Sequence, residues 1–171
     1  MFQLWDIVQH LVDPLVFLLL ASTYLPATIY SLIVSGNIGT LLSPSLFKDA
    51  WFARFWGVTG PLIRENASIN ADPLIKLAHG TVLEIGPGSG EWVHLYDKSK
   101  VSKIYGVEPN RDHHNGLRKK IKEAGLSDIY EIVSAGVEEL GEEWVARKEV
   151  DCVVTVSRFF LFCIVMRKSR R

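Results

Sequence analysis

Residues 81–92, TVLEIGPGSGEW, decide the predicted fold of this chain. A short apolar run ends in three glycines at alternate positions, Gly86, Gly88 and Gly90. Glycine adopts backbone conformations that other residues avoid, and it lets a ligand approach the main chain closely. A strand that runs into such a turn and then into a helix is typical of α/β folds that bind nucleotide-like ligands.

Predicted strands and helices alternate from this point onward. The strands are expected over residues 82–85, 103–107, 129–133 and 150–156, and the helices over residues 91–96, 110–124 and 137–147. Asn110 is a suitable cap for the second of these helices, and Gly125 a suitable stop. The alternation predicts an α/β, Rossmann-like, mostly parallel sheet of about four strands.

The glycine spacing narrows the choice of ligand. Dinucleotide-binding folds use G-x-G-x-x-G, whereas the glycines here run G-x-G-x-G and position 91 is Glu. A phosphate-binding P-loop is excluded because no Gly-Lys-Ser/Thr follows. A nicotinamide-dependent oxidoreductase is therefore disfavoured but stays open as a third alternative.

Glu108 supplies the second half of the signature. It follows the second predicted strand and lies 22 residues beyond Gly86. A carboxylate at that place can accept hydrogen bonds from both hydroxyls of a ribose. The alternative is that Glu108 is a surface acid at the end of a strand.

These residues resemble two motifs of one enzyme family. VLEIGPGSG (82–90) and YGVEPN (105–110) are similar to motif I and the following acidic motif of class I S-adenosylmethionine-dependent methyltransferases. The resemblance implies that the three glycines flank the cofactor, with Glu84 near its amino group, Glu108 on its ribose, and the turn after the third strand at the adenine. The implied cofactor-binding residues are Glu84, Gly86, Gly88, Gly90, Glu108, Ala135 and Gly136.

The resemblance assigns no catalytic residue. A general base is optional in methyl transfer when the acceptor is already nucleophilic. No metal is expected, and the net charge of zero gives no reason to expect nucleic acid as a partner. His113 and His114 are interpreted as surface histidines and Cys152 as a small buried apolar residue.

The first part of the chain is apolar. No Lys or Arg precedes Lys48, and 34 uncharged residues separate Asp13 from it. The stretch Pro14–Val34 is long enough for a membrane helix. A cleaved signal peptide fits its length and acidic start less well, and a buried core helix should show a polar stripe that is missing here. Pro26 leaves open whether this segment spans the bilayer or enters it from one side. The basic residues that follow place the rest of the chain on the cytosolic side.

An aromatic helix is expected next. Phe47, Trp51 and Phe55 recur at a spacing of four and share one helical face. This face is expected to lie at the lipid headgroups or, alternatively, to cover the following domain. Residues 57–80 contain Gly57, Gly60, Pro61 and Pro73 and are interpreted as a linker with one short helix over 72–78, capped by Asp72.

The predicted organisation therefore has four parts. They are an apolar membrane-associated segment (1–47), an aromatic helix and linker (48–80), an S-adenosylmethionine-binding Rossmann-like half (81–156) and an apolar, basic tail (157–171). Only the tail follows the fourth strand, so the chain is interpreted as truncated before the acceptor half of the fold, with that strand at an exposed edge.

The predicted function combines these parts. It is methyl transfer from S-adenosylmethionine to a small or lipophilic acceptor at a membrane, with membrane lipid as a partner and truncation expected to impair activity. The alternative is a non-catalytic, membrane-associated remnant that still binds the cofactor. The endoplasmic reticulum is a candidate location, with the soluble part facing the cytosol.

Overall fold

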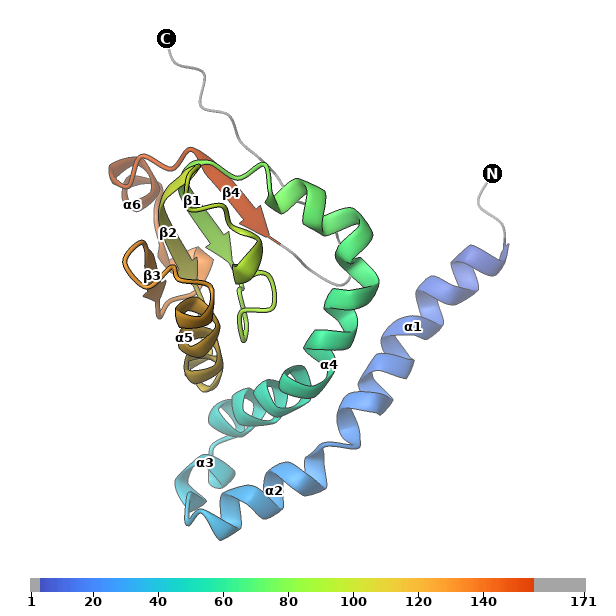
Figure 1. Cartoon of the computed structure of the whole chain (residues 1–171). Helices are drawn as coiled ribbons and strands as arrows, with labels where there is room; N and C mark the ends of the chain where they lie inside the picture. The colour runs from blue at the N-terminus through green and yellow to red at the C-terminus, as the bar shows by residue number, and fades with distance from the viewer. Residues whose placement is uncertain (1–3, 156–171) are drawn as a thin grey trace. The chain divides into compact units, whose positions relative to one another are not determined.

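The computed structural model of this chain describes residues 4–155 (Figure 1). The chain divides into two compact units, the first ending at Phe55 and the second beginning at Trp56. The predicted tail, 157–171, lies outside the described residues, as does Val156 of the predicted fourth strand.

Helices are the regular elements of the first unit over its described residues, 4–55. It contains α1 (Leu4–Ser22), α2 (Leu25–Val34), α3 (Ile38–Leu42) and the beginning of α4 (Pro44–Ile75). The apolar stretch Pro14–Val34 is long and apolar enough to cross a membrane, with a mean hydropathy of 1.7 and only 17% of its window buried.

This apolar stretch is not one uninterrupted helix. A turn at Thr23 and Tyr24 separates α1 from α2. Pro26 falls in the first turn of α2, where its missing N–H leaves no helical hydrogen bond unmade. Gly36 ends α2 with a φ of +71°, a conformation that favours glycine.

The predicted linker over 57–80 is wrong. Helix α4 runs through both of its prolines to Ile75, and Asp72 lies inside the helix rather than at its start. Pro61 and Pro73 are both exposed, so the carbonyl groups that they leave without a helical donor can bind water. Burial of Ala71 and Ile75 on the sheet then stabilises the last turns of the helix.

The second unit is built on a four-stranded sheet. Its strands are β1 (Gly80–Ile85), β2 (Val101–Val107), β3 (Tyr130–Val133) and β4 (Cys152–Thr155). They lie in the order β3-β2-β1-β4, and every pair is parallel. The predicted α/β fold with a parallel sheet is confirmed, and β4 is an edge strand of the sheet among the described residues.

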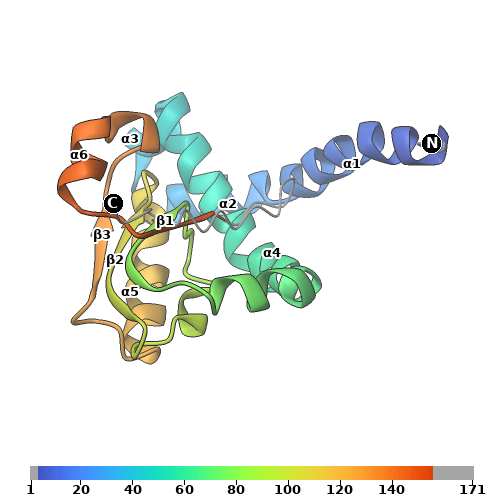
Figure 2. The same ribbon diagram turned by 90° about the horizontal axis from the view of Figure 1, so that it is seen from above.

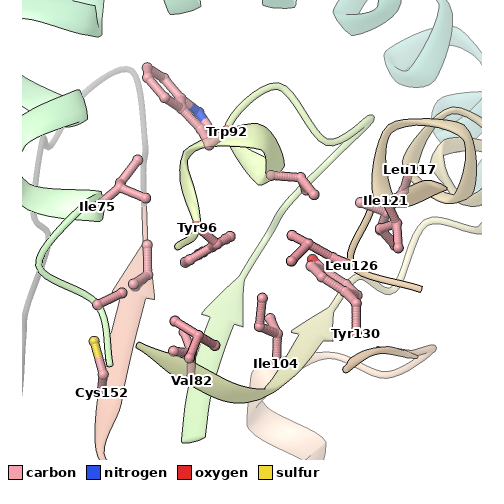
Figure 3. Close-up of a cluster of buried hydrophobic side chains, with 14 of the residues drawn as sticks. Ile75, Val82, Trp92, Tyr96, Ile104, Leu117, Ile121, Leu126, Tyr130 and Cys152 are labelled. Carbon is pink, nitrogen blue, oxygen red and sulfur yellow. The ribbon is translucent and has the colours of Figure 1, made fainter. Parts of the chain in front are cut away.

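Helices cover both faces of this sheet (Figure 2). One face carries the larger core, in which α4 and α5 (His114–Glu123) pack on the strands (Figure 3). The other face carries a smaller cluster beneath α6 (Glu142–Arg147). Cys152 points into the larger core with no exposed surface, which confirms its interpretation as a buried apolar residue.

Two predicted helices differ from the structure. Of the helix predicted over 91–96, only a single 3-10 turn, Val93–Leu95, forms. The helix predicted over 137–147 is split into a 3-10 turn, Val137–Glu139, and α6, since Gly141 interrupts it with extended ψ.

Candidate functional site

The three glycines after β1 all have positive φ, at +67°, +57° and +87° for Gly86, Gly88 and Gly90. Gly86 is exposed, and a Cβ added to it would meet nothing within 4 Å. Its backbone is therefore open to a ligand, as the sequence predicts for this turn.

Gly90 has a different role in the structure. A Cβ at this position would lie 3.0 Å from Lys120 Cβ and 3.1 Å from Leu117 Cδ1. Both of these residues belong to α5, so Gly90 lets the turn pack closely on that helix. Such a packing role is the one that the third glycine has in dinucleotide-binding turns.

Trp56 lies over Gly88. A Cβ on Gly88 would be 2.8 Å from the indole Nε1 and 3.2 Å from Cδ1, and Gly88 is buried. The indole also lies against Gly60 of α4, where a Cβ would be 3.3 Å from Nε1. The aromatic residues of the segment 47–56 therefore have different contacts. Trp56 covers the glycine turn, whereas Trp51 and Phe55 pack on α1.

Glu108 follows β2 and is tied to the glycine turn. Its Oε2 accepts a hydrogen bond from Gly88 N at 2.9 Å, and its Oε1 accepts one from Asn110 N at 3.0 Å. The residue is 6% exposed. A carboxylate has about four acceptor positions, so two remain for hydroxyl groups of a ligand. The alternative of a surface acid is wrong.

The loop after β3 joins the same edge of the sheet. Glu108 N donates to Val133 O at 2.9 Å, and Arg111 Nε donates to Ser134 Oγ at 3.2 Å. The loop itself is held by Glu139, whose Oε1 accepts a hydrogen bond from Gly136 N at 2.8 Å. The structure therefore brings Ala135 and Gly136 to the edge where the other predicted site residues lie, and their contact with an adenine stays a prediction.

The interpretation of His113 and His114 as surface histidines is wrong. They are 2% and 6% exposed. His113 Nδ1 and Ser89 Oγ are hydrogen-bonded at 3.1 Å, and His114 Nε2 donates to Glu108 O at 2.9 Å. Asn110 Oδ1 accepts from Asp112 N, as its predicted capping role requires. The imidazole of His113 lies against the glycine turn, and that of His114 lies against the end of β2.

Glu84 lies deeper than the glycine turn. It is 3% exposed and points into the larger core, where Tyr130 donates its hydroxyl to Glu84 Oε2 at 2.7 Å. Tyr130 belongs to β3 and reaches β1 by crossing Gly106 of β2, which offers no side chain in the way. The role of Glu84 near a cofactor amino group remains a prediction.

Burial raises the pKa of Glu84 from 4.5 to about 7, although hydrogen bonds from Tyr130 and Tyr96 lower it in part. The folded protein therefore holds this proton up to about neutral pH, whereas the unfolded chain releases it near pH 4.5. The stability that the protonated group contributes is complete below pH 4.5 and is lost as the pH rises through 7.

We expect a stability loss of about 3 kcal/mol from this residue over that range, at ~1.4 kcal/mol for each pH unit. Glu84→Gln keeps an acceptor for Tyr130 and cannot ionise, so its stability should depend less on pH. Thermal unfolding of the full chain in detergent at pH 5 and pH 7.5 checks this, with the wild type as reference. Equal pH dependence of the two proteins would refute the raised pKa.

Metal ligands are not gathered at this site. Within residues 4–155, no group of three or more His, Cys, Asp or Glu side chains lies close enough together to hold a metal ion. The polar groups at the turn instead contact one another and the backbone.

Several solved structures are similar to part of this chain, among them the following two. One is protein arginine methyltransferase 10 of Arabidopsis thaliana, with a TM-score of 0.42, 26% identity, and coverage of 54% of this chain and 26% of that one. The other is a proposed S-adenosyl-L-methionine-dependent methyltransferase of Methanococcus maripaludis, with a TM-score of 0.41, 20% identity, and coverage of 62% and 53%. The chain thus spans about a quarter and about half of these two proteins. No protein-family model and no curated protein sequence matches it.

Proposed function

We propose that this protein binds S-adenosylmethionine at the glycine turn and transfers its methyl group to a small or lipophilic acceptor at a membrane. The observation that carries the proposal is the hydrogen bond between Glu108 Oε2 and Gly88 N. It places a buried carboxylate directly beside a glycine turn at the carboxyl ends of two neighbouring parallel strands, which is where ligands bind in open α/β sheets.

The residues at this edge fit the chemistry of that cofactor. S-adenosylmethionine has no phosphate, so the turn needs no lysine, and the exposed backbone of Gly86 allows close approach. The two remaining acceptor positions of Glu108 match the two hydroxyls of a ribose. Ala135 and Gly136 would contact the adenine from the next loop.

The bound cofactor would supply an electrophilic methyl group on a sulfonium sulfur. The chain's own residues would then fix the geometry, because the acceptor atom, the methyl carbon and the departing sulfur must be in line while the new bond to the methyl group forms and the S–C bond breaks, with S-adenosylhomocysteine as the leaving group. Glu108 would orient the ribose, and the Gly88 N–H would hold Glu108 in place. The Trp56 indole would exclude water from the turn.

The first unit would supply the attachment to a membrane. Its apolar stretch carries no formal charge from Pro14 to Phe47. Large apolar side chains there are open to solvent, including Leu19 at 70% exposure and Leu42 at 77%. Burying such side chains in lipid is favourable. A lipophilic acceptor would be dissolved in the same membrane.

Isothermal titration of the detergent-solubilised full chain with S-adenosylhomocysteine tests the cofactor. We expect saturable binding of one molecule, with NADH as the control that should not bind. No binding of S-adenosylhomocysteine would refute the proposal, and tight binding of NADH would favour an oxidoreductase instead. Binding without methyl transfer to any acceptor offered would support the non-catalytic alternative.

A further inference from the structure

We infer that the first unit enters a membrane from one side as a helical hairpin and does not span it. The inference rests on the proposed membrane attachment and concerns its geometry. It predicts that the N-terminus and the sheet unit lie on the same side of the membrane.

The hairpin is closed by aromatic contacts between α1 and the beginning of α4. The rings of Phe17 and Phe55 meet edge to face, with centroids 4.7 Å apart, and Tyr24 lies 5.7 Å from the same ring. Phe55 is 1% exposed. The segment of 37 residues between Phe17 and Phe55 therefore has its two ends close together in space.

A second contact gives the direction of the two legs. Trp51 Nε1 donates to Ala21 O at 2.8 Å, a carbonyl group in the last turn of α1 that also accepts a hydrogen bond from Tyr24 N at 3.0 Å. Ala21, which comes later in α1, contacts Trp51, and Phe17, which comes earlier, contacts Phe55. The contacts thus run in opposite directions along the two helices. The legs are therefore antiparallel, with α2 and α3 at the far end of the hairpin.

The returning leg cannot cross a bilayer. From Pro44 to Phe55 it has 12 residues, or about 18 Å at ~1.5 Å per residue, whereas the hydrocarbon core is about 30 Å thick. Lys48, Asp49 and Arg54 lie on this leg, and charged residues are unfavourable in hydrocarbon. If α1 and α2 crossed the bilayer, residues 44–55 would have to cross it again in the opposite direction, because Phe55 contacts Phe17.

The far end of the hairpin has the chemistry of a lipid-facing surface. It contains no formal charge from the end of α1 to Lys48. Apolar side chains are exposed on α2 and α3, namely Ile29, Ile33, Val34, Ile38 and Leu42, and on the adjoining parts of the two legs, namely Leu18, Leu19, Leu20 and Leu46. Lipid acyl chains fit such a surface better than water does. The occupant is therefore one leaflet of a membrane.

Protease protection of the full chain, tagged at both ends, tests this topology on sealed membrane vesicles from expressing cells. We expect the two tags to have the same sensitivity before detergent is added. One digested and one protected tag would establish a spanning segment and overturn the one-sided entry, while the membrane attachment would stand.

Flotation of the same vesicles after an alkaline wash tests the attachment itself. The full chain should float with the lipid, and Leu42→Lys should reduce the floated fraction at least threefold. The matched control is Leu77→Lys, an exposed leucine of the second unit at 61% exposure, which should leave flotation unchanged. A wild-type chain that stays with the soluble proteins would overturn the attachment and the hairpin together. Equal effects of the two lysine variants would overturn the inference that the far end of the hairpin faces lipid.

Discussion

Gly106→Ala is expected to destabilise the sheet unit by about 3 kcal/mol. A Cβ at this position would overlap the hydroxyl of Tyr130 and lie 2.6 Å from its Cε1 and 2.7 Å from its Cζ. The tyrosine cannot move aside freely, because its own strand fixes its Cβ in register with Ile104. The change therefore combines overpacking with the loss of the hydroxyl that Tyr130 donates to the buried Glu84.

The melting temperature of the full chain in detergent should fall by roughly 12–24 °C. Gly57→Ala is the matched control, since Gly57 is exposed inside α4 and a Cβ there would meet nothing within 4 Å. That variant should be as stable as the wild type or about 1 kcal/mol more stable. Unchanged melting of the Gly106 variant would mean that Tyr130 does not cross β2 as described.

Glu108→Ala is expected to weaken S-adenosylhomocysteine binding roughly 10- to 100-fold, since a hydrogen bond to a charged group is worth about 1.5–3 kcal/mol. Isothermal titration of the solubilised full chain measures the change. The loss should have two sources, the proposed bonds to the ribose and the bond that fixes Gly88 N.

Two further variants serve as controls for the alanine change. Glu108→Gln keeps one carbonyl oxygen as an acceptor and should lose less affinity than the alanine variant. Asp128→Ala removes a surface carboxylate paired with Lys98 and should leave binding unchanged. The melting temperature of each variant shows whether the turn is still folded. Wild-type affinity in a folded Glu108→Ala protein would remove this residue from the site.

Much of the sheet unit is predictable because its signals are local. Apolar runs with turn residues between them predict all four strands, and the order of strands and helices predicts that the sheet is parallel. Gly86 and Glu108 indicate the site in the sequence. A positive φ favours glycine, and a carboxylate at the end of a strand can only be Asp or Glu. These features depend on residues close together in sequence.

The parts that could not be predicted depend on tertiary packing. Local glycine and proline signals favour a linker over 57–80, but contacts of Ala71 and Ile75 with the sheet keep α4 helical. The pair of Glu84 and Tyr130 joins residues 46 positions apart, and no local pattern shows their distance. Gly106 is the one available signal, because a glycine inside an apolar strand indicates close approach of another group.

The inward direction of His113 and His114 was missed for a similar reason. Two polar residues at the start of a helix are typical of a solvated surface. After the 3-10 turn that precedes α5, both side chains are buried, His113 against Ser89 of the glycine turn and His114 against the Glu108 carbonyl. Only the backbone geometry of that turn shows that the two histidines are buried and not on the surface.

Phe55 and Trp56 are neighbours in sequence, yet one closes the hairpin and the other covers Gly88. No linker residues separate the two units along the chain. With the hairpin in a leaflet, the protein would search for acceptors in two dimensions, and a short tether raises the effective concentration of membrane-dissolved molecules at the site. Turnover would then follow the mole fraction of the acceptor in the lipid and would fall by surface dilution when inert lipid is added.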